Sequence, residues 1–532
     1  MKKVFLSCLM ASSLISWNTF AETHSGTSGG VDWYISEDGV LLITKKSGGN
    51  GNMGSYSKSG IGSNAPWYQY KDKITSINVA GDVNSITTYA FRGLTNVEYV
   101  NISEGVKTIG NTAFENNTSL KSVTIPNSVT SMGNYVFKID PAAGTSSLTS
   151  LTLGSGITSI GQQAFYGAAS LESVTIPSTI TSIGDNAFYG ATSLTSLTIE
   201  NGVTTIGKNA FENATSLTSI TIPDSVTSLG EAAFKGASNL TDLNLGNGLT
   251  VIETHAFENA YSLQTLTLPQ SVTQIKEGAF SRAISLTEID FGGVTDIGTK
   301  SFAYAFSLET LTIPDTVKTI GNGAFVNATS LKELVIGDGV TSLGDKSFSV
   351  DNQYNPDPSH PYTSVLEKLT IGKNLTSIGS NCFTGAPITE LTVDADGENF
   401  QVIANFFKNR KPPITTFNCL GAERSVCEQK MADAGWDITS LAGEGIMRGG
   451  TMEEEEEEIV EETPVAGGDD IVPSGSGGVS SGTSGSGGSG SGSGSSGSGS
   501  SGGASANIDV DSGSGAGGGF SGHPYGLPSR SI

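Results

Sequence analysis

One column of polar residues in this chain has the spacing of a binding surface. Its members recur every 22 or 23 positions, and five of the seven are threonine: Thr175, Thr198, Thr221, Asn244, Thr267, Asp290 and Thr312. Hydroxyl, amide and carboxylate groups in a row can hold a ligand by hydrogen bonds. A simpler explanation accounts for most of the column, because β-branched threonine suits an exposed strand and bonds along the sheet. We expect specificity in the middle, where Asn244 and Asp290 interrupt the threonines and Asp242 and Glu288 lie alongside.

The residues that usually carry catalysis or bind metals show no such organisation. The histidines are scattered through the chain, at His24, His255, His360 and His523. No Cys/His group has the spacing of a zinc site, and no serine lies in a nucleophile elbow. The Gly-rich C-terminal tail contains G-x-G patterns, but no expected strand precedes them and no helix follows, so they do not predict nucleotide binding. We therefore predict a protein that is not an enzyme and that holds no cofactor and no metal.

The cysteines near the end of the repeats raise the question of a disulfide. Cys419 is expected to face inward on the last coil, and Cys427 inward on a helix that follows it. In an oxidising compartment these two residues could form a disulfide that closes a short loop. Two free buried thiols are the alternative, because three cysteines outside the N-terminal segment cannot all pair. Cys382 stands where other repeats have alanine before phenylalanine, so we interpret it as a small buried residue.

These residues are positioned by a 23-residue repeat, which occurs five times without a gap between residues 171 and 285. In the copy LTSLTIENGVTTIGKNAFENATS, alternation turns Leu197 and Ile199 inward and the residues between them outward. A second apolar pair supplies a short second strand, and the segment around Phe211 suits one helical or 3₁₀ turn. Stacked units of this kind predict a β-dominated α/β-type solenoid, a right-handed superhelix of coils with a parallel strand, a short second strand and a short helical turn.

Stacking places equivalent residues of successive coils side by side, so each apolar column becomes a continuous core. The clearest column is aromatic and comprises Phe91, Phe114, Phe137, Phe165, Phe188, Phe211, Phe234, Phe257, Phe280, Phe302, Phe325, Phe348 and Phe383. Burial of one phenylalanine per coil contributes roughly 1.5–3 kcal/mol each by area. This column is expected to hold the coils together.

The first residues have the features of a secretory signal peptide. Lys2 and Lys3 precede the apolar run Val4–Trp17, and small residues lie near Ala21. We predict that residues 1–21 direct export and that the protein is secreted, or associated with the cell surface. No other stretch has the roughly 18 consecutive apolar residues that a membrane span needs, so no transmembrane span is expected.

The rest of the chain divides into four regions by composition and repeat pattern. They are an N-terminal cap (22–73), the repeats (74–393), a last degenerate coil with a C-terminal cap helix (394–441), and an acidic, then Gly/Ser-rich tail (442–532). The tail cannot bury a core, and we expect it to be disordered. The formal net charge of −24 argues against a nucleic-acid partner, because phosphate binding depends on clustered Lys and Arg.

The repeat consensus, L-x-x-[LIV]-x-[IL]-P-x-[ST]-[VI]-[TK]-x-[IL]-G-x-x-A-F-x-x-[AC], resembles the BspA-like leucine-rich repeat family of bacterial and protist secreted and surface proteins. The resemblance covers residues 31–441 and extends to Trp33 and the Ala65-Pro66-Trp67-Tyr68 segment. One departure is alanine where many relatives have cysteine, at Ala191, Ala214, Ala237 and Ala260. The resemblance implies a leucine-rich repeat fold and, for several members, adhesion to host proteins, other microbes or surfaces.

Fold and resemblance together favour a role in recognition. We expect a secreted or surface protein that adheres to an extracellular protein or glycan through an extended solenoid surface. The alternative is a structural scaffold component of an envelope or extracellular matrix that has no specific ligand. Binding of a partner by the repeats would favour the first, and self-association without a partner would favour the second.

Overall fold

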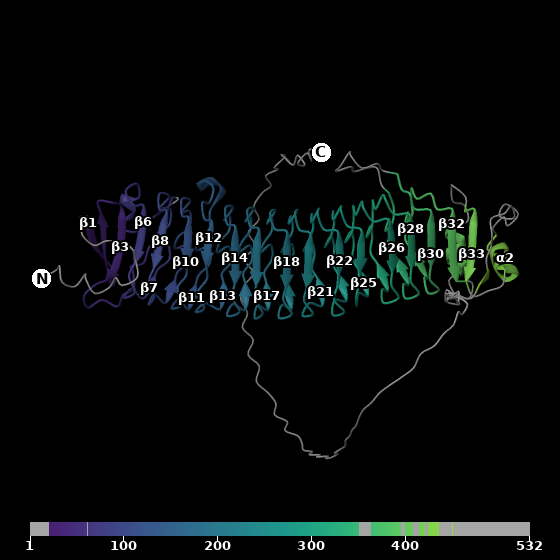
Figure 1. Cartoon of the computed structure of the whole chain (residues 1–532), viewed down its shortest axis with the longest axis horizontal. Helices are drawn as coiled ribbons and strands as arrows, with labels where there is room; N and C mark the ends of the chain where they lie inside the picture. The colour runs from purple at the N-terminus through teal and green to yellow at the C-terminus, as the bar shows by residue number, and fades with distance from the viewer. Residues whose placement is uncertain are drawn as a thin grey trace, which may run out of the picture. The chain divides into compact units, whose positions relative to one another are not determined.

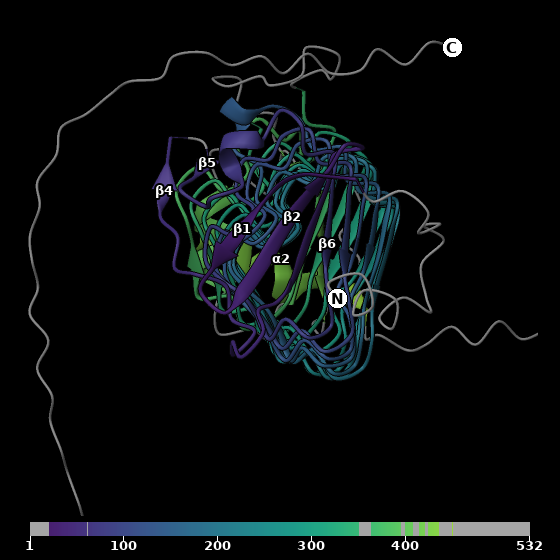
Figure 2. The same cartoon turned by 90° about the vertical axis from the view of Figure 1, so that its left-hand side faces the viewer.

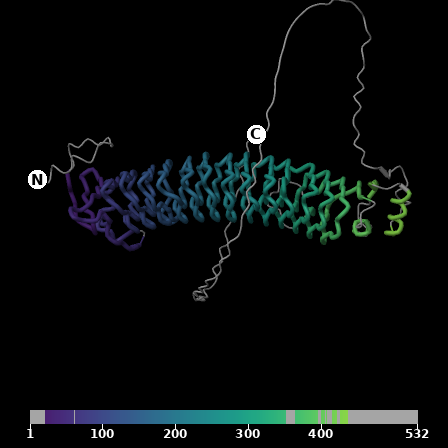
Figure 3. Tube along the Cα trace, turned by 90° about the horizontal axis from the view of Figure 1, so that it is seen from below, coloured from purple at the N-terminus to yellow at the C-terminus, as the bar shows by residue number. Residues whose placement is uncertain are grey.

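The computed structural model describes residues 21–60, 62–350, 363–394, 400–407, 414–420, 424–435 and 449–450. The expected signal peptide lies outside the described residues except for Ala21, and of the expected tail only 449–450 are described. The fold is a β-solenoid, as the repeat pattern predicts, and Figure 3 shows its coils following one another in sequence order.

Each coil contributes one strand of three to five residues to a first row of parallel strands, which carries most of the labels in Figure 1. The row consists of β6 (Ser76–Val79), β8 (Tyr99–Ile102), β10 (Ser122–Thr124), β12 (Ser150–Thr152), β14 (Ser173–Ile176), β16 (Ser196–Ile199), β18 (Ser219–Ile222), β20 (Asp242–Leu245), β22 (Thr265–Thr267), β24 (Glu288–Asp290), β26 (Thr310–Ile313), β28 (Glu333–Ile336), β30 (Lys368–Ile371), β32 (Glu390–Asp394) and β33 (Thr416–Leu420).

A second row consists of two-residue strands. They are β7 (Ser85–Ile86), β9 (Thr108–Ile109), β11 (Ser131–Met132), β13 (Ser159–Ile160), β15 (Ser182–Ile183), β17 (Thr205–Ile206), β19 (Ser228–Leu229), β21 (Val251–Ile252), β23 (Gln274–Ile275), β25 (Asp296–Ile297), β27 (Thr319–Ile320), β29 (Ser342–Leu343) and β31 (Ser377–Ile378). Both rows pair in parallel and at the repeat period: Leu197 lies opposite Val174, and Ile206 lies opposite Ile183. The constant period therefore sets the register of the sheet.

The third segment of the coil differs from the expected helical turn. Asn209 and Asn213 have φ values of +55° and +64°, which a right-handed helix does not allow. Their N–H groups point along the solenoid to the next coil, and bond Glu231 O at 2.9 Å and Lys235 O at 2.7 Å. The Phe211 N–H also bonds the next coil, at Ala233 O (2.8 Å), whereas the N–H groups on either side of it close turns within the coil, as from Ala210 to the carbonyl of residue 207 at 3.3 Å. Asparagine tolerates this left-handed conformation better than most residues do, but Ala232 also adopts it at the position of Asn209. The hydrogen bonds between coils therefore go with consecutive turns in place of the helix.

The phenylalanine column forms the centre of the core. Phe211 is fully buried, and its ring is stacked on Phe188 and on Phe234, with both centroid distances 5.2 Å. Aromatic rings continue the column at both ends, because Trp67 stacks on Phe91 at 5.5 Å and Phe407 contacts Phe383 at 5.7 Å. The core is thus one uninterrupted stack.

An antiparallel meander precedes the first coil. It consists of β1 (Glu22–Ser28), β2 (Val31–Ser36) and β3 (Val40–Lys45), and β3 then pairs in parallel with β6. A hairpin of β4 (Lys58–Ser59) and β5 (Gly62–Ser63) and the 3₁₀ turn η3 (Tyr68–Tyr70) follow. Trp33 and Trp67 are buried beneath these elements, and the Trp67 indole N–H donates to Ala90 O at 2.8 Å. These tryptophans thus cover the apolar end of the stack.

A buried ion pair connects this N-terminal region to the first two coils. The Arg92 guanidinium binds the Glu115 carboxylate, and both side chains are almost fully buried. Arg92 also donates to the carbonyl oxygens of Gly60 and Gly62, each at 2.9 Å. One side chain therefore neutralises a buried charge and holds the β4–β5 hairpin.

Beyond the repeats, the described elements are α1 (Phe400–Phe407), α2 (Arg424–Asp433) and β34 (Gly449–Gly450), while η4 (Pro141–Ala143) lies in an insertion within the repeats. β34 pairs with β33 at the C-terminal edge of the sheet. Cys427 and Met431 of α2 are buried, and so is Ala434 directly after the helix. The insertion at 351–362 lies outside the described residues.

Candidate functional site

All seven residues of the predicted polar column are exposed on the first row of strands. They lie on successive strands, and three neighbouring pairs are in direct register: Thr175 with Thr198, Thr221 with Asn244, and Thr267 with Asp290. The strand alternation explains this placement, since the residues on either side of them in each strand point into the core. The structure therefore brings the column together on one surface, which we call the strand face.

The same face carries a second exposed row, two residues earlier in each strand. Its members in the central coils are Ser196, Ser219, Asp242, Thr265 and Glu288. The sequence predicts Asp242 and Glu288 beside the column, and the same period-two alternation accounts for the others. Together the two rows give every strand a pair of outward polar groups.

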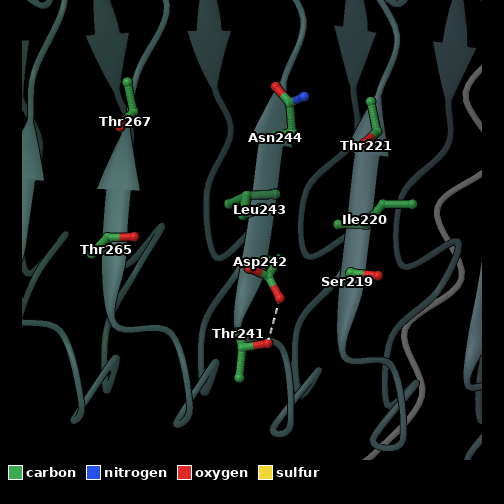
Figure 4. A pocket seen from close by; sticks show the side chains of 9 residues that line it. All are labelled: Ser219, Ile220, Thr221, Thr241, Asp242, Leu243, Asn244, Thr265 and Thr267. Atoms are coloured by element: carbon green, nitrogen blue, oxygen red, sulfur yellow. Dashed lines mark hydrogen bonds between the residues drawn. The ribbon is translucent and has the colours of Figure 1, made fainter.

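The strand face is hollowed across β18, β20 and β22. The hollow encloses about 260 Å³ and is lined by Ser219, Ile220, Thr221, Thr241, Asp242, Leu243, Asn244, Thr265 and Thr267. Figure 4 shows these side chains on three adjacent strands, with Asn244 between Thr221 and Thr267. The hollow thus lies at the Asn244 interruption, where the sequence predicts specificity.

The hollow coincides with an interruption of the strand ladder. β18 pairs with β20 over four residues and β22 pairs with β24 over three. β20 and β22, by contrast, belong to different sheets. Similar interruptions separate β16 from β18 and β24 from β26. Strands that do not complete a ladder direct backbone N–H and C=O groups toward the space between them. The floor of the hollow can therefore supply backbone hydrogen bonds besides those of its side chains.

The chemistry of the lining is that of a hydrogen-bonding site. The lining has five hydroxyls, one amide and one carboxylate, together with Ile220 and Leu243, whose side chains pack against the core, and it contains no histidine, cysteine, lysine or arginine. The Thr241 hydroxyl lies 2.8 Å from Asp242 Oδ2 and 3.0 Å from Thr218 O, and these contacts fix its position. Such a set can bind a polar, uncharged group through several donors and acceptors at once.

The strand face becomes acidic toward its C-terminal half. Asp242, Glu288, Asp290 and Glu333 are all exposed there. Two lysines belong to the same region: the Lys332 ammonium lies 2.8 Å from Glu309 Oε2, and Lys368 is exposed on β30 opposite Glu333, so acidic side chains still outnumber basic ones. The charge therefore favours neutral or cationic ligands over anionic ones.

Among the residues that the structure describes, no three His, Cys, Asp or Glu side chains are grouped as a metal site. The helices of that same part of the chain include none that is long and apolar enough to cross a membrane. His255 lies on the turn side of its coil, with Nδ1 3.2 Å from Glu258 Oε2, and is not brought to the strand face.

Cys419 and Cys427 are joined as a disulfide in the structure, with Cα atoms 6.1 Å apart. Both residues are buried, so the bond connects the last strand of the first row to α2. Cys382 is also buried, as the sequence predicts, and its sulfur lies 2.9 Å from the Ser347 hydroxyl.

Comparison with protein families gives one match, to the BspA-type leucine-rich repeat region, over residues 60–142, 140–263, 228–355 and 359–415. Comparison with curated proteins gives no match. Solved structures similar to this chain include a leucine-rich cell surface protein of Faecalibacterium prausnitzii, with 24% identity over 66% of this chain and 95% of that one and a TM-score of 0.35. They also include a leucine-rich repeat protein of Bacteroides ovatus, with 18% identity over 82% of this chain and 100% of that one and a TM-score of 0.45.

The family match covers more than half of the chain, and its repeats are the coils that carry the strand face. The family assignment made from the repeat consensus is therefore confirmed. The chain belongs to the BspA-type leucine-rich repeat family.

Proposed function

We propose that this protein is a secreted or surface-associated recognition protein that adheres to an extracellular protein or glycan through its strand face. The observation that carries the proposal is the hollow across β18, β20 and β22, which outward polar side chains line at a point where the strand ladder is incomplete. A purely structural solenoid gains no stability from such an interruption, because each incomplete ladder gives up backbone hydrogen bonds.

The composition of the face supports recognition over catalysis. Threonine and serine hydroxyls are short and stiffly held on strands, so they lose little entropy when a ligand binds. Several such groups in a fixed array give a ligand many weak contacts, which suits adhesion through an extended surface. The export expected from residues 1–21 would place this surface outside the cell, where such ligands occur.

The test is a binding screen of the full chain against extracellular matrix proteins and glycans, followed by two matched variants. The site variant carries Thr221→Arg and Asn244→Arg, which place two long cationic side chains in the hollow. The control carries Thr124→Arg and Thr152→Arg, the same change at exposed positions of the same column in β10 and β12.

The proposal expects saturable binding that the site variant loses and the control retains, with equal thermal unfolding of all three proteins. Equal loss of binding in both variants would indicate that the ligand contacts extend over the whole strand face. Binding retained by the site variant would contradict a role for the hollow. The absence of any ligand, together with open-ended self-association, would favour the structural scaffold.

A further inference from the structure

The two ends of the first row of strands differ in whether another strand covers their outer edge. At the C-terminal end, β34 pairs with β33 and covers part of its outer edge. At the N-terminal end, β1 is the first strand of its sheet, and no described strand pairs with its outer side. Figure 1 shows β1 at the end of the strand row, and Figure 2 shows β1 and β2 facing the viewer when that end is seen directly.

The printed hydrogen bonds of the meander show which groups of β1 face outward. Lys46 N donates to Gly30 O at 3.0 Å, so even-numbered residues of β2 bond toward β3. Odd-numbered residues of β2 then bond toward β1, as Glu37 N does to Ala21 O at 3.0 Å. Through the register of β1 with β2, the N–H and C=O groups of Ser25 and Thr27 point away from the sheet.

This edge lacks the usual protection against pairing. Exposed edge strands are commonly interrupted by lysine or proline. The seven residues of β1, ETHSGTS, contain neither, and both Ser25 and Thr27 are exposed. A bulge occurs only at the start of the strand, between Glu22 and His24. The outer edge is therefore ready to accept another strand.

The charge of this end favours a second copy of the same chain. The whole chain carries a formal charge of −24, which opposes contact between most of its surfaces. Residues 22–73, however, contain five acidic and five basic residues, so the N-terminal cap is formally neutral. Two caps can meet without the repulsion that the rest of the chain would cause.

The strand is also self-complementary. About a two-fold axis at Gly26, antiparallel pairing places Ser25 of one copy opposite Thr27 of the other and repeats the same contact on the other side of the axis. Small β-compatible polar residues then lie opposite each other, with no like charges in direct opposition. We propose that β1 pairs with β1 of a second copy, so that two solenoids join end to end in a closed dimer whose strand faces both stay open to ligand.

The test removes only the outward N–H groups. Ser25→Pro with Thr27→Pro deletes these two donors and leaves the β1–β2 bonds in place, because proline is tolerated where its missing N–H would face solvent. The control is Ser25→Ala with Thr27→Ala, which keeps both donors. The full chain and both variants are compared by sedimentation equilibrium over a wide concentration range, with thermal unfolding as a check of the fold.

The expected result is a concentration-dependent dimer of the wild type and of the alanine variant, with a dissociation constant at least about tenfold weaker in the proline variant. Amide hydrogen exchange of wild-type residues 22–28 should also slow as concentration rises, which tests the contact without any substitution. A monomer at every concentration, equal dimerisation of the proline variant, or growth beyond a dimer would overturn the proposal. Slow exchange of these amides in a monomer would show that another segment of the chain covers the edge. None of these outcomes depends on ligand binding at the hollow.

Discussion

The phenylalanine stack makes a quantitative prediction about what holds the coils together. Phe211 is fully buried between Phe188 and Phe234, with both centroid distances 5.2 Å. Phe211→Ala removes the ring and leaves a cavity between two coils that cannot collapse, because every neighbour is held in register by its own strands. Replacing a buried phenylalanine by alanine costs about 3–5 kcal/mol. We expect a loss in the upper part of this range.

Phe211→Leu separates the contribution of buried volume from that of the aromatic contacts. Leucine fills much of the volume but removes both aromatic contacts, which are each worth about 0.5–1.5 kcal/mol beyond area burial. The expected cost of Phe211→Leu is therefore about 1–3 kcal/mol, clearly below that of alanine. Lys208→Ala in the same coil is the control, since it removes only an exposed ion pair to Glu231 and should cost no more than about 1 kcal/mol.

The assay is urea unfolding at equilibrium, followed by circular dichroism for the strands and by tryptophan fluorescence, which reports on Trp33 and Trp67 in the N-terminal cap and on Trp436 after the repeats. Long repeat arrays can unfold in stages, so agreement between the two probes is checked before free energies are compared. An alanine variant within about 1 kcal/mol of the wild type would refute the account of the core. A leucine variant as unstable as the alanine variant would refute the importance of buried volume.

Three further predictions concern residues outside the stack. Arg92→Ala leaves the Glu115 carboxylate buried without its partner and should lower the free energy of urea unfolding by about 3–5 kcal/mol. The double variant Arg92→Met with Glu115→Leu should recover most of this loss. An Arg92→Ala variant as stable as the wild type would contradict the prediction. Cys427→Ser removes the disulfide and should lower the free energy of unfolding by about 2.5 kcal/mol, on the chain-entropy estimate for a loop of about nine residues. Alkylation of the wild type before reduction should leave both Cys419 and Cys427 unlabelled. Labelling of both residues would contradict the bond. Burial raises the pKa of Glu212 in the fold, so the folded state binds its proton more tightly and the unfolding free energy should gain from this group as pH falls from 7 toward about 4.3. Glu212→Gln should flatten that part of the pH profile, and an unchanged profile would contradict the assignment.

Much of the fold follows from the repeat period alone. A constant 23-residue spacing places Leu197 opposite Val174, and it stacks Phe211 between its two neighbours. The exposed positions of the polar column follow from the same alternation. The Arg92–Glu115 pair could also have been found, because its members are 23 residues apart and therefore occupy equivalent positions in adjacent coils.

Other features depend on information that a periodic pattern does not contain. The turns at Asn209 and Asn213 replace the expected helix because their N–H groups bond the next coil, which apolar spacing does not report. Residue type does not decide this conformation, since Tyr135 and Ala232 also have positive φ at the position of Asn209. The incomplete ladder between β20 and β22, at which the hollow lies, is one such feature, because their sequences alternate as regularly as those of neighbouring strands.

The most direct test of the recognition account is amide hydrogen exchange of the full chain with and without a ligand found in the binding screen. The account predicts that a saturating ligand slows exchange in residues 219–221, 241–244 and 265–267, where the hollow lies. Exchange that slows only in the caps or along the turns, with these three segments unchanged, would contradict the claim that the strand face binds the ligand.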